Sequence, residues 1–149
     1  MRKTLCILAL AVAGSHSAHA YAQADFGNPT AARAVVEAYY KAIDEGNYRT
    51  AYYLWRGNGK ASGKTYSGFR RGFSETARTR VLTREPVNSS GAMGSIYIDV
   101  PVDVFATLKN GRRQHFGGKY TLVRVNDVDG ANEEQLRWHL ASATLRAQP

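Results

Sequence analysis

The chain has 149 residues, of which 20 are lysine or arginine and 12 are aspartate or glutamate, and its single cysteine excludes an internal disulfide framework. Eight of the basic residues lie between positions 56 and 84 beside one acid, Glu75, so this segment carries most of the net charge of +8. A concentrated positive field favours anionic partners, and a solvated face that aids solubility is the simpler interpretation.

The first 22 residues have the three parts of a cleavable secretory signal peptide. Two basic residues precede an apolar run at 4–14, and small residues follow in Ala18-His19-Ala20 and Ala20-Tyr21-Ala22. The apolar run is shorter than the roughly 20 residues that span a bilayer. We therefore expect a periplasmic or secreted protein that is cleaved after Ala20 or Ala22.

Cleavage would also remove the only cysteine. Cys6 lies at the start of the apolar run rather than at its end, which argues against a lipoprotein anchor. No later apolar run is long enough for a transmembrane segment. The remaining residues, 23–149, are enough to bury a core of their own, and we expect a single domain.

Helical patterns occupy the first half of this domain. Asn28 followed by Pro29 is a typical helix start, and apolar residues recur at helical spacing until Gly46 ends the helix. Asn47 can cap a second, shorter helix that ends near residue 55. A glycine-rich loop at 57–63 precedes a third short helix or turn, expected over 66–76.

In the second half of the domain, apolar residues recur at every second position, as they do in strands. Strands are expected over 80–87, 96–108, 113–126 and 135–145, with a hairpin turn at Asn110-Gly111. Pro101 should mark a bulge or an edge, because proline cannot donate to a ladder. Helices followed by about four antiparallel strands predict an α+β domain with helices packed on one face of a sheet.

Three segments resemble the nuclear transport factor 2-like superfamily. YYKAIDEGNYRTAYYLW (39–55) is similar to its opening helices, and GGKYTLVRV (117–125) and QLRWHLASATL (135–145) are similar to its last two strands. The resemblance implies a cone-shaped, cystatin-like domain whose curved antiparallel sheet wraps the first helix and leaves a cavity at its wide end. It also implies that homodimers through the outer face of the sheet are common, and it leaves function open, since this fold hosts many functions.

Two groups of residues are candidate binding sites. If the resemblance holds, the open end of the cone would be lined by aromatic residues, namely Tyr52, Trp55, Tyr66, Phe69 and Trp138. The alternative is that they pack into the core, as aromatics at helical spacing commonly do. The basic segment supplies a candidate partner surface, formed by Arg70, Arg71, Arg78 and Arg80.

A catalytic set is hard to find in this sequence. Asp103 is the candidate general base, but strand alternation turns it away from the apolar face unless a bulge near Pro101 reverses its side. His115 and His139 lie on different expected strands without metal-ligand spacing, so no metal is expected. No serine lies in a G-x-S-x-G turn.

A nucleotide cofactor is not expected either. The loop GNGKASGKT (57–65) has Asn58 where a phosphate loop needs glycine, and a helix rather than a strand precedes it. Export also argues against nucleic acid as a routine partner. The sequence therefore predicts a domain without a cofactor.

The leading hypothesis is an exported, non-catalytic domain that binds a protein partner or a small apolar ligand, with an anionic partner favoured by the basic segment. One alternative is an isomerase, cyclase or dehydratase that works in the cone without a cofactor. It requires an ionisable group buried among aromatics. Another is an interaction protein that inhibits a toxin or takes part in secretion.

Overall fold

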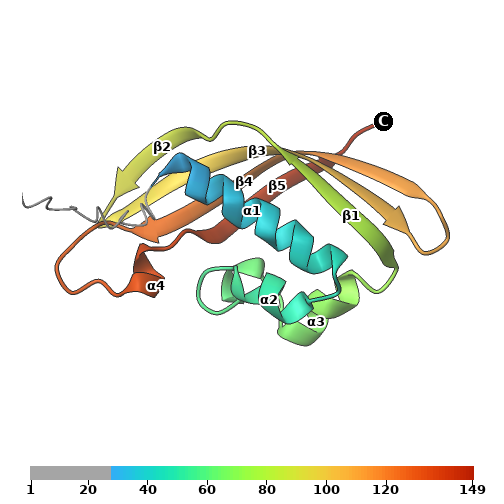
Figure 1. Ribbon diagram of the computed structural model, residues 1–149, viewed down its shortest axis with the longest axis horizontal. Helices are drawn as coiled ribbons and strands as arrows, with labels where there is room; N and C mark the ends of the chain where they lie inside the picture. Colours follow the sequence, from blue (N-terminus) through green and yellow to red (C-terminus); the bar gives the residue numbers. More distant parts are fainter. Residues whose placement is uncertain (1–27) are drawn as a thin grey trace, which may run out of the picture.

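A computed structural model describes residues 28–149 of the chain. Helices come first, followed by a curved, unclosed antiparallel sheet (Figure 1). The helical part contains α1 (Pro29–Asp44), α2 (Tyr48–Tyr53), a single 3-10 turn η1 (Lys60–Ser62) and α3 (Tyr66–Gly72). The remaining elements are β1 (Thr76–Thr83), β2 (Val87–Ala92), β3 (Ser95–Leu108), β4 (Arg113–Val125), α4 (Glu133–Leu136) and β5 (His139–Ala147).

The sheet is organised around its longest strand, β3. Its strand order is β1-β3-β4-β5, and β2 pairs with β3 on the same side as β1. β1 pairs with the second half of β3, and β2 pairs with the first half. The expected α+β arrangement is confirmed, with five strands instead of about four.

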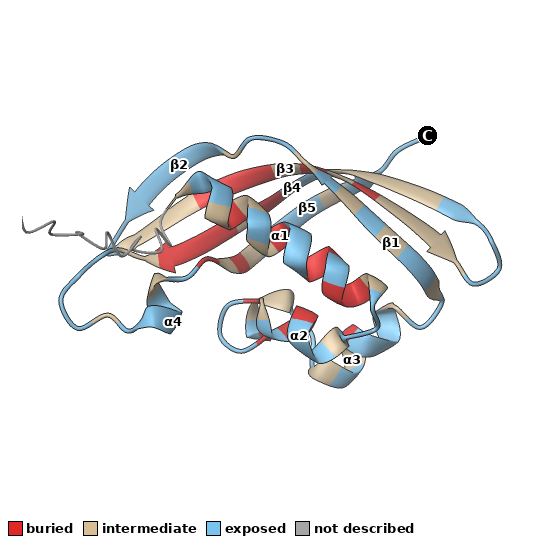
Figure 2. Cartoon of the chain, in the orientation of Figure 1, coloured by how far each residue is buried: buried red, intermediate tan, exposed pale blue. Residues whose placement is uncertain are grey.

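The first helix forms where the sequence predicts it. The Asn28 side chain accepts a hydrogen bond from the Ala31 amide at 2.8 Å, and Pro29 occupies the first turn. One face of α1 is buried against the sheet, comprising Ala32, Val36, Tyr39, Tyr40, Ala42 and Ile43. Figure 2 shows this buried face turned toward the buried parts of β3 and β4.

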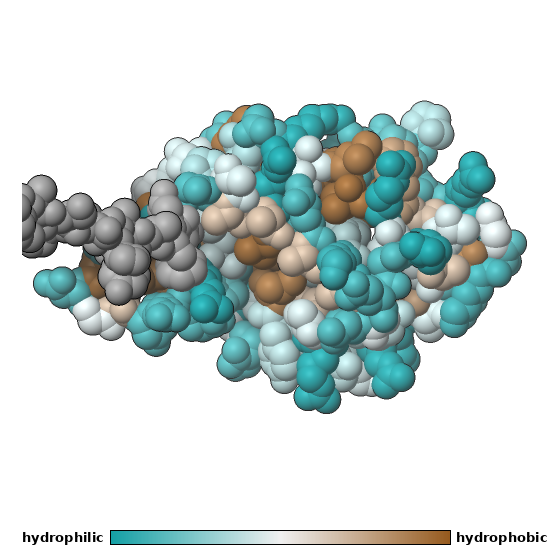
Figure 3. Space-filling model, in the orientation of Figure 1, coloured by the Kyte–Doolittle hydropathy of each residue, from teal (hydrophilic) through white to brown (hydrophobic). Residues whose placement is uncertain are grey.

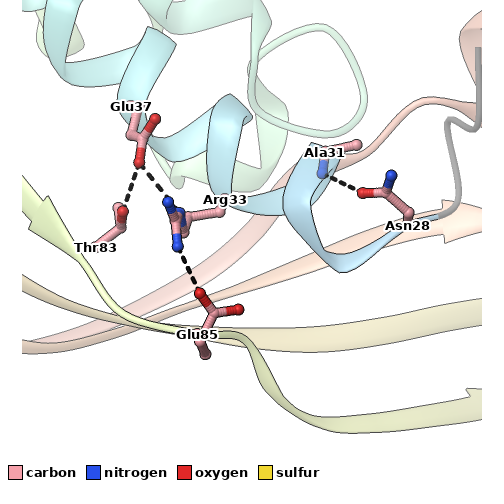
Figure 4. Close-up of polar contacts among 6 residues, drawn as sticks. All are labelled: Asn28, Ala31, Arg33, Glu37, Thr83 and Glu85. Carbon is pink, nitrogen blue, oxygen red and sulfur yellow. Dashed lines mark hydrogen bonds and ion pairs between the residues drawn. The ribbon is translucent and has the colours of Figure 1, made fainter.

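Polar contacts fix the start of α1 to the outer edge of the sheet. Arg33 pairs with Glu85, in the connection between β1 and β2, at 2.8 Å (Figure 4). Arg33 also contacts Glu37 within the helix, and Glu37 accepts a hydrogen bond from the Thr83 hydroxyl at 2.5 Å. These groups are largely exposed, so they position the helix more than they stabilise it.

The apolar face of β3 forms the floor of the core. Ile98, Val100, Val102 and Val104 are buried in the same cluster as the apolar face of α1. This confirms the alternation read from the sequence. The residues between them point to the outer face of the sheet.

Two of the four predicted strands, the first and the last, have wrong boundaries, and one strand was not expected. β1 begins at Thr76, four residues before its expected start, because the third helix already ends at Gly72. β2 was not expected, since its sequence VNSSGA is polar and every one of its residues is exposed. An edge strand without a buried face has no apolar alternation that a sequence could reveal.

Pro101 occupies neither a bulge of the β3–β4 pair nor an edge strand. The register between β3 and β4 is unbroken through Pro101 and its partner Lys119. On the other side, β1 ends at Thr83, and the Arg84 amide donates to the Pro101 carbonyl at 3.0 Å. The Pro101 nitrogen, which carries no hydrogen, therefore faces the gap between β1 and β2. No strand there needs a hydrogen bond from it.

The last predicted strand begins with a helix instead. Asn132 and Gln135 form a reciprocal capping box that starts α4, and β5 begins only at His139. Leu140 of β5 exchanges backbone hydrogen bonds with the segment after α2, at 2.9 Å to the Leu54 carbonyl and 2.8 Å from the Arg56 amide. This pairing joins the helical layer to the sheet.

The predicted signal peptide and its cleavage points at Ala20 and Ala22 lie outside the described residues. Within residues 28–149, no helix combines the length and the apolar character needed to cross a membrane.

Candidate ligand-binding site

The aromatic residues expected to line a cavity form part of a closed core. Tyr52, Trp55, Phe69 and Trp138 are buried, and Tyr66 is half-buried. The Tyr52 ring lies 5.6 Å from Tyr66 and 5.3 Å from Phe69. Tyr52, Phe69 and Trp138 belong to the core cluster, and Tyr66 packs against it; the Trp138 ring also lies under the Arg124 guanidinium. None of the five lines the depressions described in this section.

A group of tyrosines provides the polar centre of this core. The hydroxyls of Tyr40 and Tyr120 are hydrogen-bonded at 2.6 Å, and the Tyr39 ring lies 5.0 Å from Tyr40 and 5.9 Å from Tyr120. Burial raises the pKa of Tyr40 to about 12 and holds the pKa values of Tyr39 and Tyr120 well above their ordinary range. All three are therefore protonated at neutral pH.

Asp103, the candidate general base, lies on the outer face of the sheet. Its carboxylate accepts a hydrogen bond from the His115 ring at 2.9 Å and pairs with the Arg84 guanidinium. The hydrogen bond to His115 is the main reason that the pKa of Asp103 lies below its usual value. Because the register is continuous through Pro101, no bulge turns this side chain inward.

Asp99 also faces outward, and it is the more buried acid, with 7% of its surface exposed. Burial alone would raise the pKa of Asp99, but it accepts hydrogen bonds from Lys119 at 2.6 Å, Thr121 at 2.7 Å and Asn88 at 3.1 Å. Together these donors lower the pKa of Asp99. β3 thus supplies no carboxylate to the interior of the domain.

A pocket opens at the end of the sheet where β4, α4 and the segment after α2 meet. We call it the Arg124 pocket; it has a volume of about 260 Å³. Its walls are Tyr53, Arg56, Gly57 and Asn58 after α2, Ser95, Val123, Arg124 and Val125 from the sheet, and Glu134, Gln135 and His139 around α4.

Arg124 is the central group of this pocket. Only 7% of its surface is exposed, and its guanidinium lies over the Trp138 ring, 5.6 Å from the centroid. Nη1 donates to the Val125 carbonyl and to the Asp127 carboxylate, both at 3.1 Å. Nε is buried without a partner, and Nη2 makes no hydrogen bond to any described residue.

The charge of Arg124 is only partly compensated. Its one acidic partner, Asp127, has 80% of its side chain exposed, so solvent screens that pair. Arg56 adds a second positive charge to the wall, and its side chain has no ion pair or hydrogen bond among residues 28–149. A buried cation with unused donors is costly, and an anion in the pocket would offset that cost.

Glu134 is the single acid in the wall of the pocket. Its side chain is 69% exposed, and it contacts His139 Nε2 at 2.8 Å. The other ring nitrogen of His139 faces the Arg137 carbonyl at 3.1 Å, so both nitrogens already have oxygen partners. Across the described part of the chain, no group of three or more His, Cys, Asp or Glu side chains is arranged to hold a metal ion.

The sequence of β4 contains one signal for this pocket, an arginine among inward-facing positions. Along β4, Tyr120, Leu122 and Arg124 alternate onto the inward face. An arginine in line with core residues is an exception to apolar patterning, and such exceptions mark functional positions. Arg56 and His139 carried no comparable signal, because only the Leu140 pairing brings their segments together.

The four predicted surface arginines line two different depressions. Arg70 and Arg71 are exposed on α3 and line one depression with Lys109, whereas Arg78 and Arg80 of β1 line another. Arg78 forms a two-pronged pair with Asp44 at 2.9 and 3.0 Å. Arg80 lies over the Phe105 ring, 4.9 Å from its centroid.

Comparison with known proteins identifies the fold. No model of a protein family matches the chain, and no curated protein matches its sequence. Among solved structures, a protein provisionally named an aromatic ring hydroxylase from Novosphingobium aromaticivorans aligns with a TM-score of 0.57 and 14% identity, over 80% of this chain and 92% of that one.

Two further structures are similar to the chain at comparable levels. One is provisionally named a scytalone dehydratase, also from Novosphingobium aromaticivorans, with a TM-score of 0.54, 12% identity and coverage of 80% and 83%. The other is a nuclear transport factor 2-like superfamily protein from Salmonella enterica, with a TM-score of 0.51, 12% identity and coverage of 80% and 92%. The domain therefore has the nuclear transport factor 2-like fold.

Proposed function

We propose that this protein is a non-catalytic binding domain and that the Arg124 pocket takes a small organic anion, such as a carboxylate. The observation that carries the proposal is the side chain of Arg124, which lines the pocket, is more than nine-tenths buried, and has no hydrogen bond from Nε or Nη2 to any described residue. A pocket of about 260 Å³ lies near the lower end of small-molecule sites.

The walls of the pocket fit such a ligand. Arg56 and Arg124 provide two positive charges against one acid, Glu134, which is largely exposed. Arginine forms two parallel hydrogen bonds with a carboxylate, which gives both strength and orientation. Tyr53 and Val123 in the wall offer apolar surface for the body of the molecule.

Binding is preferred over catalysis because of where the ionisable groups lie. The acids of β3, Asp99 and Asp103, are paired with Lys119 and Arg84 on the outer face. The buried tyrosines have pKa values raised by burial, and none borders the Arg124 pocket. The two possible bases in the pocket wall, Glu134 and His139, contact each other at 2.8 Å, and the second His139 ring nitrogen faces the Arg137 carbonyl, so both already have polar partners.

A titration with benzoate tests the proposal, with benzamide as its neutral counterpart. In ¹H–¹⁵N spectra, benzoate should shift the amides of Gly57 and Val125 and the indole N–H of Trp138, whereas benzamide should bind at least tenfold more weakly. Arg56→Gln should weaken benzoate binding about tenfold. The matched control is Arg146→Gln, which removes the same charge from an exposed position outside the pocket.

Two results would refute the proposal. One is equal binding of benzoate and benzamide, since the charge would then contribute nothing. The other is an equal loss in Arg56→Gln and Arg146→Gln, since that would reflect overall charge. Arg56 is exposed and has no polar side-chain partner among residues 28–149, so its replacement should leave the fold intact.

A further inference from the structure

A second depression lies at α3, and it shares no residue with the Arg124 pocket. We call it the α3 depression; it has a volume of about 480 Å³ and is lined by Tyr48, Ser67, Arg70, Arg71, Ser74 and Lys109. Figure 1 places α3 and the β3–β4 turn toward one end of the long axis and α4 toward the other. The two sites can therefore be tested independently.

Tertiary structure assembles the positive charge of the α3 depression from distant segments. Arg70 and Arg71 are on α3, and Lys109 follows β3 directly. The Lys109 amide donates to the Glu75 carbonyl at 2.8 Å, which holds the end of β3 against the loop after α3. Figure 3 shows hydrophilic side chains along the lower edge of this face, where α3 lies in Figure 1.

These cations are not compensated locally. Arg71 donates to the Ser67 hydroxyl at 2.7 Å, and neither Arg70 nor Lys109 has a side-chain hydrogen bond or ion pair within residues 28–149. No carboxylate lines the depression. Three positive charges around one hollow repel each other, and a bound anion would relieve that repulsion.

The donors fit an anion with several terminal oxygens. Two guanidinium forks and one ammonium surround the hollow, and the hydroxyls of Ser67, Ser74 and Tyr48 add neutral donors. A carboxylate offers only two oxygens, whereas a phosphate monoester offers three and carries up to two negative charges at neutral pH. The number and spread of the donors favour the phosphate.

We propose that the α3 depression binds a phosphoryl group held by Arg70, Arg71 and Lys109. The group is either free phosphate or the phosphate monoester headgroup of phosphatidic acid, since both present at least three terminal oxygens. This site is independent of the small organic anion proposed for the Arg124 pocket.

The experiment compares two double variants with equal loss of charge. Arg70→Gln/Lys109→Gln removes two charges that line the depression, whereas Arg112→Gln/Arg113→Gln removes two neighbouring charges that do not. Inorganic phosphate is titrated into the full domain in ¹H–¹⁵N spectra, and co-sedimentation is measured with phosphatidic acid vesicles and with phosphatidylcholine vesicles. All four side chains are exposed, so both variants should fold.

Phosphate should shift the amides of Ser67 to Arg71, and the affinity should fall at least tenfold in the first variant and less than threefold in the second. Binding only to phosphatidic acid vesicles, with the same difference between variants, would assign the lipid as the source. Equal losses in both variants would overturn the proposal, because general electrostatic attraction would then explain binding. Binding of neither probe would overturn it as well.

Discussion

At the residue scale, the two faces of the sheet differ in how their charged side chains are paired. On the outer face, acids are paired with cations, as Asp99 is with Lys119 and Asp103 is with Arg84. On the inner face, Arg124 is buried with donors left over. The ion pairs of Asp99 and Asp103 hold neighbouring strands together. Arg124 has hydrogen-bond donors without partners, and a bound anion could accept from them.

The hydrogen bond between Tyr40 and Tyr120 is the first residue-scale prediction. Tyr40→Phe and Tyr120→Phe should each lower the free energy of unfolding by about 1–2 kcal/mol, because each leaves a buried hydroxyl without this partner. The double variant should cost less than the sum, since it removes both polar groups. Urea denaturation measures the three values, and simple additivity would contradict direct coupling between the two hydroxyls.

The second prediction concerns the contribution of Asp99 to stability and its dependence on pH. Its folded pKa is lowered, so its hydrogen bonds contribute stability above the unfolded pKa near 4, and that contribution is lost as the pH falls through the folded pKa. Asp99→Asn should therefore cost about 1–2 kcal/mol at pH 7, and the difference from the native chain should shrink at pH 2.

Urea unfolding at several pH values checks this dependence on Asp99. Asp129→Asn is the control, because Asp129 is exposed and has no ion pair among residues 28–149. A stability difference for Asp99→Asn that stays constant from pH 7 to pH 2 would count against the linkage argument.

At the element scale, the loop after α2 shapes the wall of the Arg124 pocket. The Tyr52 hydroxyl donates to the Lys64 carbonyl at 2.8 Å, so the loop closes over the Tyr52 ring. Gly59 has a φ of +92°, and a Cβ there would lie 2.1 Å from that ring. The neighbouring residues Gly57 and Asn58 line the pocket, so the packing of this loop sets its width.

Gly59→Ala tests how closely the loop after α2 packs against Tyr52. It should lower the free energy of unfolding by about 2–3 kcal/mol, from steric overlap added to the strain of a positive φ. Gly63→Ala is the matched control, since Gly63 has a φ of +71° but open space around its Cβ, and it should cost about 1 kcal/mol. Equal losses in urea denaturation would show that contact with Tyr52 is unimportant.

At the scale of the whole molecule, two positively charged hollows lie apart on one small domain. The Arg124 pocket is built on the end of β4, and the α3 depression is built at the end of β3. Neither uses the closed aromatic core, which holds the helices against the sheet. The curved sheet thus provides separate sites at its ends while its inner face is filled.

The whole-chain prediction concerns export. Expression of the full chain in a bacterium with a secretory pathway should yield a periplasmic or secreted protein that begins at Tyr21 or Gln23. Intact-mass measurement identifies the first residue. A protein that keeps residues 1–22 and stays in the cytoplasm would contradict the predicted signal peptide.

The sequence by itself determined the α+β class, the boundaries of α1 and the apolar face of β3. These features depend on caps and on periodicity, which are local and need no distant partner. It misplaced β1 and missed β2, because an exposed edge strand leaves no apolar pattern. It also missed α4, although the capping residues Asn132 and Gln135 are local signals.

Only the tertiary structure decided the sites. Arg124 meets Arg56 because Leu140 pairs with the segment after α2, and Lys109 meets Arg70 because β3 ends beside α3. These residues come together through backbone pairing between distant segments. The local pattern of the sequence does not reveal such pairing. Among the predicted surface arginines, Arg78 pairs with Asp44 of α1, a contact that the sequence alone did not reveal.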